Sequence, residues 1–193
     1  MGMQVLALMG GIVAFLSGLL LIYGVTRGSF HLSVATMALW SIIDGSILLA
    51  SLASGATVPF LSAGLFTGTL LLTFVLFFKG NWKWGMLENI CTIVTLVCLV
   101  LWYIAGPIFA LVSLTIGKYL VAGAPNAIAA YKRPEPRQAP PWLMGLFASG
   151  TNIFTLGTWT MAESFFPTAA FAFSLLISSI HLFHKIDNKQ AME

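Results

Sequence analysis

Long apolar stretches, separated by short polar segments, account for almost the whole of this chain. Each stretch holds about 20 residues, which is the length an α-helix needs to cross the hydrocarbon layer of a membrane. The segments between them are too short to form further elements of regular structure. The pattern predicts seven spanning helices, over residues 3–25, 33–54, 57–78, 86–104, 107–130, 141–160 and 165–184.

Composition leads to the same class of protein. Of the 193 residues 59% are hydrophobic and only 8% are charged, whereas soluble domains carry about 25% charged residues. So few charges do not cover a surface that faces water, while a surface that faces lipid needs none. We therefore expect an all-α integral membrane protein without a soluble domain. Its net charge of +3 is explained by membrane orientation and needs no nucleic-acid partner.

The basic residues predict that orientation. All but Lys118, which lies inside a stretch, follow the first, third, fifth and seventh stretches, and the loops on the other side carry no Lys or Arg. Short loops rich in Lys and Arg remain in the cytoplasm. The N-terminus is therefore expected outside and the C-terminus in the cytoplasm, in the inner (plasma) membrane. The residues that set this orientation are Arg27, Lys79, Lys83, Lys132, Arg133, Arg137, Lys185 and Lys189.

An internal repeat is suggested by a constant offset of 108 residues. The offset superimposes the first three predicted helices on the last three, and an even number of crossings separates the equivalent helices. The two triplets would then be parallel repeats about an axis along the membrane normal. Residues 1–78 would form the first repeat, 79–106 a linker helix with its flanking loops, and 107–193 the second repeat with the tail. The matched pairs are Tyr23 and Tyr131, Ser41 and Ser149, Asp44 and Asn152, and Pro59 and Pro167.

Part of the second repeat resembles a known clan. The second repeat contains Ala124–Pro125–Asn126, Tyr131–Lys132–Arg133–Pro134–Glu135 and Pro141–Trp142, followed by Asn152. These segments resemble sequences of the PQ-loop clan, which includes the SWEET sugar transporters, vitamin transporters and small bacterial proteins. The resemblance implies a 3+1+3 arrangement of helices around a central path. The clan's Pro-Gln pair reads Pro125–Asn126 here, and the third helix of each triplet lacks the Asn that lines the sugar cavity of SWEET proteins.

Two lone charges lie deep in predicted spans. Asp44 lies roughly 16 Å into its helix at about 1.5 Å per residue, where a charged carboxylate costs about 2.5–3.5 kcal/mol. A cation, a water-filled cavity or protonation has to offset that cost. Lys118 lies at a similar depth, so we predict that the two lie within reach of a bridging water. The alternatives are that Asp44 holds helices together by hydrogen bonds and that Lys118 extends toward an interface.

Four further residues complete the predicted site. Asn152 is the repeat partner of Asp44 and is expected either to line the cavity or to bond neighbouring helices. Trp40, one turn before Asp44, is a candidate for stacking against a solute ring or for packing. Pro125 has no N–H for the carbonyl of Val121, so Pro125 and Asn126 are candidates for an inner gate, with a simple kink as the alternative.

Catalytic and cofactor signatures are missing from the sequence. No nucleophile motif, phosphate-binding glycine loop or metal-ligand cluster is present, and His181 and His184 have no further ligand residues near them in the sequence. A retinal protein would need a Lys in its last helix, and here that helix has none before Lys185. We therefore expect a protein that is not an enzyme and has no cofactor.

The sequence favours a transporter or facilitator for a small polar solute that works by alternating access, with proton coupling through Asp44 as an option. The alternative is a receptor or sensor that does not transport. The expected partners are the solute and the lipid bilayer, and a homo-oligomer is left open.

Overall fold

The computed structural model describes residues 2–28, 32–57, 59–79, 82 and 84–183, and all regular structure within them is helical. The first half comprises α1 (Gly2–Thr26), α2 (Val34–Ala53), α3 (Phe60–Lys79) and α4 (Met86–Ala105). The second half comprises α5 (Pro107–Ile116), a π-helical segment (Gly117–Ala122), α6 (Ala124–Lys132), a short 3₁₀ turn (Pro136–Gln138), α7 (Ala139–Phe154) and α8 (Met161–Phe183). The predictions for Lys83, His184, Lys185 and Lys189 lie outside the described residues.

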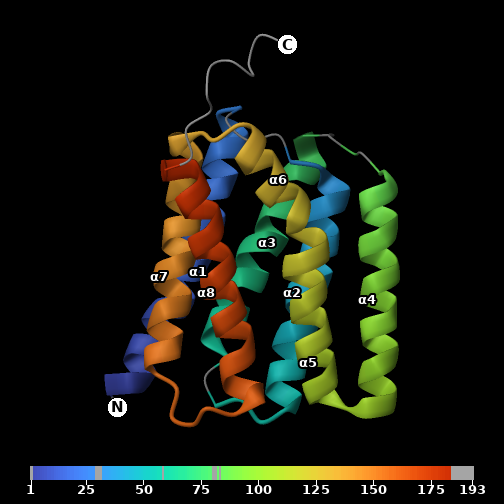
Figure 1. Cartoon of the computed structure of the whole chain (residues 1–193), viewed down its shortest axis with the longest axis vertical. Helices are drawn as coiled ribbons and strands as arrows, with labels where there is room; N and C mark the ends of the chain where they lie inside the picture. Colours follow the sequence, from blue (N-terminus) through green and yellow to red (C-terminus); the bar gives the residue numbers. More distant parts are fainter. Residues whose placement is uncertain (1, 29–31, 58, 80–81, 83, 184–193) are drawn as a thin grey trace.

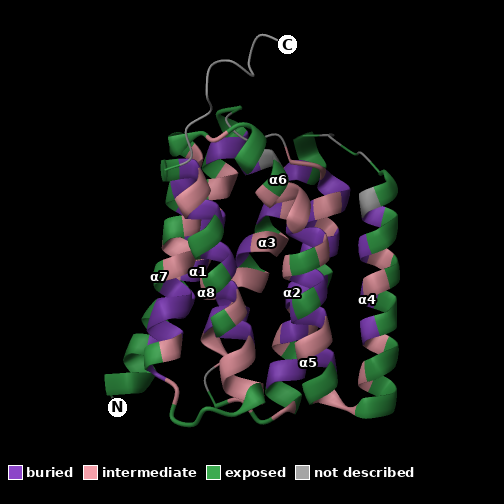
Figure 2. Ribbon diagram, in the orientation of Figure 1, coloured by how far each residue is buried: buried purple, intermediate pink, exposed green. Residues whose placement is uncertain are grey.

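The protein is an integral membrane protein, and the described part of the chain contains six helical segments long and apolar enough to cross a membrane. One of them is the continuous stretch 107–132, which includes the π segment. The predicted sixth span corresponds to α7, whose 16 residues make it shorter than the other six. Many large apolar residues are exposed, and exposed residues occur along the helices (Figure 2), where lipid would solvate the apolar ones.

The helices lie side by side along one axis, and the spanning stretches alternate in direction, with α6 continuing α5 in the same direction (Figure 1). As a result α1 begins at one end of the bundle and α8 finishes at the other. Helix α3 packs against both α1 and α2, and α8 packs against α7 and against the α5–α6 stretch. One group of packed helices, α1 to α3, meets the other, α5 to α8, where α1 contacts α7 and where α2 contacts α5. Helix α4 lies at the edge, against α5 and α2.

Glycines bring α1 and α3 together at backbone distance. A Cβ atom added to Gly64 would lie 2.1 Å from the carbonyl oxygen of Gly11, and one added to Gly18 would lie 2.7 Å from the Cα of Gly68. Small residues at a helix contact are the usual means of tight packing in lipid, where apolar side chains gain little from leaving the solvent. This contact fixes the position of α1 relative to α3.

The loop between the last two helices differs from the prediction. The helix expected over 141–160 ends at Phe154, and the loop expected at Met161–Ser164 is instead the first turn of α8. Threonines and Gly157 in the segment 155–160 have low helix propensity, which ends α7 early. The carbonyl of Thr160 accepts the N–H groups of Glu163 and Ser164 at 3.1 and 2.9 Å, which starts α8. Trp159, which falls inside the predicted span 141–160, therefore lies in a loop.

The predicted helix over 107–130 is interrupted by the π-helical segment and a bend at Gly123. The missing N–H of Pro125 removes a regular helical bond, and a wider turn before it accommodates the change. A Cβ on Gly123 would lie 2.7 Å from Cζ of Phe173, so this bend also requires a residue without a side chain. π-helical turns occur frequently at functional sites, and this one carries Lys118.

The N-terminus of α4 is joined to α2 by Glu88. Its Oε2 accepts the N–H of Gly85 at 2.8 Å, and its Oε1 accepts the hydroxyl of Thr36 at 2.6 Å. A carboxylate in the first turn is also favoured by the helix dipole. Glu88 therefore stabilises the start of its own helix and the contact with α2.

Candidate functional site

The centre of the bundle contains an ion pair between Lys118 and Asp44. Nζ of Lys118 donates to Oδ1 of Asp44, and the two side chains are 3% and 0% exposed. The predicted proximity of the two charges is confirmed, and the contact is direct. Thr69 of α3 adds a hydrogen bond from its hydroxyl to Oδ2 at 3.2 Å. Three elements thus hold two buried charges, each of which would be costly to bury alone.

Three aromatic rings surround the ammonium group of Lys118. Nζ lies 5.2 Å from the ring centroid of Tyr119, 5.4 Å from that of Trp40 and 5.5 Å from that of Phe166. Ring faces within about 6 Å attract a cation, so these rings stabilise the charge together with Asp44. The sequence analysis named Trp40 as a candidate. It missed Tyr119 and Phe166, because no spacing in the sequence relates residues of three different helices.

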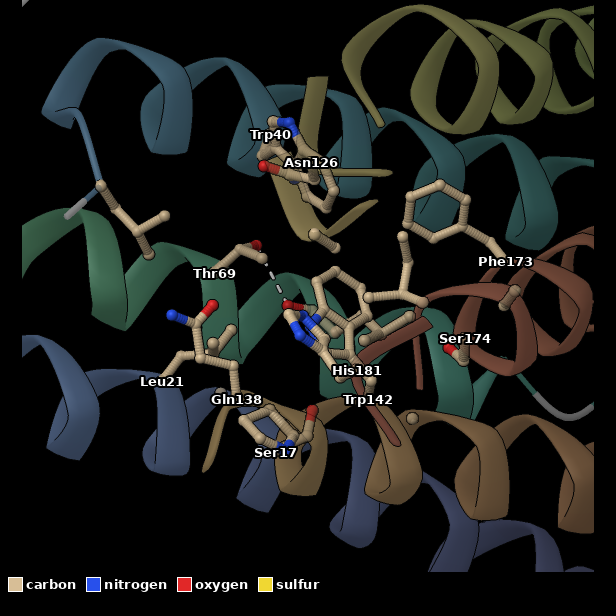
Figure 3. Close-up of a pocket in the computed structure, with 18 of the residues that line it drawn as sticks. Ser17, Leu21, Trp40, Thr69, Asn126, Gln138, Trp142, Phe173, Ser174 and His181 are labelled. Atoms are coloured by element: carbon tan, nitrogen blue, oxygen red, sulfur yellow. Dashed lines mark hydrogen bonds between the residues drawn. The ribbon is translucent and has the colours of Figure 1, made fainter. Parts of the chain in front are cut away.

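A cavity of about 580 Å³ lies between the two groups of helices. Figure 3 shows residues from α1, α2, α3, α6, α7 and α8 pointing toward it. Lys118, Trp40 and Thr69 line its deep part, and Asp44 lies behind Lys118 and Thr69. The other lining residues used below are Ser17, Tyr119, Asn126, Trp142, Phe173, Ser174 and His181.

The cavity reaches the end of the bundle formed by Arg133, Glu135, Arg137 and Gln138, which we call the mouth end. There the N–H of Glu135 donates to Nδ1 of His181 at 3.1 Å, which ties the loop after α6 to the end of α8. Nδ1 is thereby an acceptor, so the ring proton of neutral His181 is on Nε2. Among the described residues no group of three His, Cys, Asp or Glu side chains could hold a metal ion.

The opposite end, which we call the closed end, holds a pocket of only about 20 Å³. Glu163 of α8 joins the two groups of helices here. It accepts the N–H and the hydroxyl of Thr57 at 3.3 and 2.8 Å, and the hydroxyl of Thr158 at 3.0 Å. Leu61 lines both this pocket and the large cavity, so its side chain lies between the two.

The remaining candidates lie in different places. Asn126 lines the large cavity near Trp40 (Figure 3), whereas its neighbour Pro125, in the first turn of α6, is not among the lining residues. Asn152 is 2% exposed and lines the small pocket at the closed end. Its Nδ2 donates to the carbonyl of Ala148 at 3.0 Å. The structure therefore brings together Asp44, Lys118, Trp40 and Asn126, and places Asn152 apart from them.

Comparisons with known proteins add no relative to this description. Scans of protein-family models, curated proteins and solved structures return no match to the chain. The function has to be argued from the cavity and its surroundings.

Proposed function

We propose that this protein transports a small polar solute across the membrane by alternating access. The observation that carries the proposal is the cavity between the two groups of helices, which leads from the mouth end to the buried Lys118–Asp44 pair. The small pocket of the closed end lies on the far side of Leu61, and its lining includes the polar residues Ser51, Ser62 and Asn152. A solute path that is closed at one end would consist of two such polar sections separated by an apolar layer.

The contacts between helices support a 3+1+3 arrangement. The middle helix of one triplet is α3 and that of the other is α8, which are equivalent under the 108-residue offset. The same offset exchanges the two contacts between the triplets, α1 with α7 and α2 with α5. Helix α7 would then be the sixth of seven crossings despite its length, and α4 the linker. This pattern is expected of parallel repeats related by a two-fold axis.

Charge gives the proposed direction. The mouth end carries Arg133 and Arg137, and basic loops remain in the cytoplasm. The N-terminus would then be outside, and the conformation described here would be open to the cytoplasm. Solute release or uptake on the other side requires the closed end to separate at Leu61 and Glu163.

Within this mechanism, Lys118, Asp44, Trp40 and Asn126 contact the solute or a coupled proton. A proton on Asp44 would weaken its bond to Lys118 and free the ammonium group for a solute, which is a direct route to coupling. Pro125 and the π segment supply the bend at which α6 moves relative to α5. Asn152 contacts the solute only after the closed end opens.

A receptor or sensor is the second candidate, because the large cavity reaches the mouth end and is separated from the closed-end pocket at Leu61. Such a protein needs a pocket on one side and no route to the other. The two functions differ in whether position 152 ever becomes accessible from the closed end.

Cysteine labelling distinguishes them without knowledge of the solute. Cys91 and Cys98, both buried and free, are first replaced by Ala, and Ser17→Cys, Asn152→Cys or Tyr103→Cys is introduced. Tyr103, 94% exposed near the end of α4, is the control position for access from the closed end.

A transporter should allow a membrane-impermeant maleimide to react with the Ser17→Cys variant from the mouth side and with the Asn152→Cys variant from the other. Labelling of the Ser17→Cys variant but not of the Asn152→Cys variant, with the Tyr103→Cys control reactive, would reject transport and support a receptor.

A further inference from the structure

We infer that the cavity binds a planar aromatic acid, that is, a flat ring system carrying a carboxylate. This inference rests on the proposed function, because it names the solute class of the same site. It follows from the rings that line the cavity, from one buried donor without a partner, and from the charges around it.

Aromatic surface dominates the middle of the cavity. Tyr119, Trp142 and Phe173 form a connected group, with ring centroids 5.1 Å apart between Tyr119 and Phe173 and 5.7 Å apart between Trp142 and Phe173. Trp40 of α2 faces the same space from the other triplet (Figure 3). Tyr119 and Trp142 are only partly buried, so part of their ring surface is open to a solute. Flat rings pack favourably by stacking or edge contacts.

A buried donor marks where a polar group of the solute would bind. Trp40 is 8% exposed, and its Nε1 has no hydrogen-bond partner among the residues that the structure describes. Buried polar atoms are almost always paired, and an unpaired donor costs the protein the desolvation of that group. Nε1 itself is almost inaccessible in this conformation, so an acceptor on the solute would satisfy it after a small rotation of the indole ring. Since Trp40 also faces Lys118, that acceptor would lie close to a positive charge.

The ammonium group of Lys118 can donate a hydrogen bond to the same acceptor. This group has three N–H donors, and within the described residues its hydrogen-bonding acceptor is Asp44. A carboxylate has two oxygens, so one could accept from Nε1 of Trp40 and the other from Nζ of Lys118. An amide carbonyl would have to serve both donors with the two lone pairs of one oxygen, and it carries no negative charge to pair with Lys118.

The charges around the cavity favour an anion. Lys118, Arg133 and Arg137 are opposed by Asp44 and Glu135, which leaves one net positive charge. An organic cation would meet Lys118 at the deep end and the two arginines at the mouth end. The mouth end would therefore attract an acid and repel an amine.

Two hydroxyl groups of the lining are already bonded within the protein, which disfavours a sugar. The hydroxyl of Ser17 donates to the carbonyl of Ala14 at 2.7 Å, and that of Thr69 bonds Asp44 and carbonyls of its own helix. A polyol needs many free partners. A cavity of about 580 Å³ has the size of typical small-molecule sites and accommodates a bicyclic acid.

The test is calorimetric titration of the purified full-length protein with five probes. These are 2-naphthoate, its neutral amide 2-naphthamide, the saturated acid decahydro-2-naphthoate, the cation 2-naphthylmethylamine, and glucose, each corrected for mixing with detergent micelles. We expect 2-naphthoate to bind at least tenfold tighter than each of the others. Equal binding of the saturated acid would overturn the role of the rings, and equal binding of the amide or amine would overturn the preference for an acid. Binding of glucose alone would overturn the whole inference.

Substitutions of the proposed binding residues test where the acid binds. Trp40→Phe keeps a ring but removes Nε1, and should weaken 2-naphthoate about tenfold while leaving 2-naphthamide within about threefold. The matched control is Trp159→Phe, because Trp159 is 70% exposed in the loop before α8 and should leave binding unchanged. The double variant Lys118→Met with Asp44→Asn keeps the net charge and should abolish the preference for acid over amide. Unchanged affinity in well-folded Trp40→Phe protein would reject the assigned donor.

Liposome flux separates this inference from the proposed function. Binding of 2-naphthoate without its accumulation in proteoliposomes, with the Asn152→Cys variant unreactive from the closed end, would reject transport and leave the solute class standing. Failure of all aromatic probes to bind, while the Asn152→Cys variant reacts from the closed end, would reject the solute class and leave transport standing.

Discussion

The two ends of the bundle differ in what separates them from the centre. At the mouth end, loops with charged side chains surround an opening that leads to Lys118. At the closed end, Leu61 lies between the large cavity and a pocket of about 20 Å³, and Glu163 joins the two groups of helices by two hydrogen bonds to Thr57. Leu61 belongs to a packed apolar cluster that includes Phe166 and Ala170. The closure therefore consists of this apolar layer and one hydrogen-bonded carboxylate.

The same difference is visible in the helices that form the two ends. Helix α7 ends early, at Phe154, and α8 begins early, at Met161. The first turn of α8 is what brings Glu163 to Thr57 of the other triplet. Under the 108-residue offset α3 has no equivalent of this turn, since Pro59 precedes α3 whereas Pro167 lies inside α8. The closed end is therefore one of the places where the two halves differ.

The largest effect on stability is expected from breaking the Lys118–Asp44 pair at the centre of the bundle. Lys118→Met leaves Asp44 buried without its partner, and breaking a buried ion pair costs about 3–5 kcal/mol. We expect the free energy of unfolding to fall by that amount, measured by denaturation in mixed micelles. Adding Asp44→Asn should restore most of the loss, and Lys132→Met, at an exposed site in the last turn of α6, should cost little. A single variant as stable as the parent protein would show that the pair is not needed.

The next prediction concerns the apolar layer. Leu61→Ala should join the large cavity to the small pocket and cost about 2–4 kcal/mol of stability through the lost packing. It should also produce a leak of small polar solutes in proteoliposomes. Leu71→Ala on the same helix is the control, because Leu71 is 39% exposed and is not among the residues that line the cavity. Tight liposomes with Leu61→Ala would mean that other side chains close the path.

A smaller effect is expected from the hydrogen bonds of Glu163. Glu163→Gln removes a charged acceptor, and a hydrogen bond to a charged group contributes about 1.5–3 kcal/mol when it is buried and less near the surface. Opening of the closed end should become easier, so the thiol introduced by Asn152→Cys should react several-fold faster from that side. Glu135→Gln, at the mouth end, should leave that rate unchanged. Equal rates in both variants would indicate that Glu163 does not hold the ends together.

The smallest effect is expected from Pro125→Ala. The new N–H can donate to the carbonyl of Val121 and make the bend before α6 more regular. We expect transport to slow a few-fold while the affinity for 2-naphthoate stays the same. Flux in proteoliposomes measures the first and calorimetry the second. Unchanged flux would remove the hinge role of Pro125 and leave a simple kink.

Much of the fold was predictable because lipid imposes a strong rule. Each stretch of about 20 apolar residues must satisfy its backbone within a helix, so the helices were found within a few residues of their observed bounds in most cases. The exception was the loop before α8, where threonines and Glu163 form bonds with partners in other segments. Helix ends depend on such bonds, and hydropathy does not register them.

The site was predictable only where burial of charge restricts the options. Asp44 and Lys118 were expected near each other because two lone charges at the same depth are far less costly together than apart, and the structure pairs them. Tyr119, Trp142 and Phe173 gave no comparable signal, since an aromatic side chain in a membrane helix can face lipid as readily as it can face a cavity.

The sequence by itself determined that the chain is helical and membrane-embedded, and that its two deep charges need each other, because these follow from the cost of exposing polar groups to hydrocarbon. Only the tertiary structure decided which side chains face the cavity, that Asn152 lies apart from it, and which end is closed. These features depend on how each helix is rotated about its axis and on contacts between residues far apart in the chain. An apolar stretch that is hydrophobic on all sides does not specify that rotation.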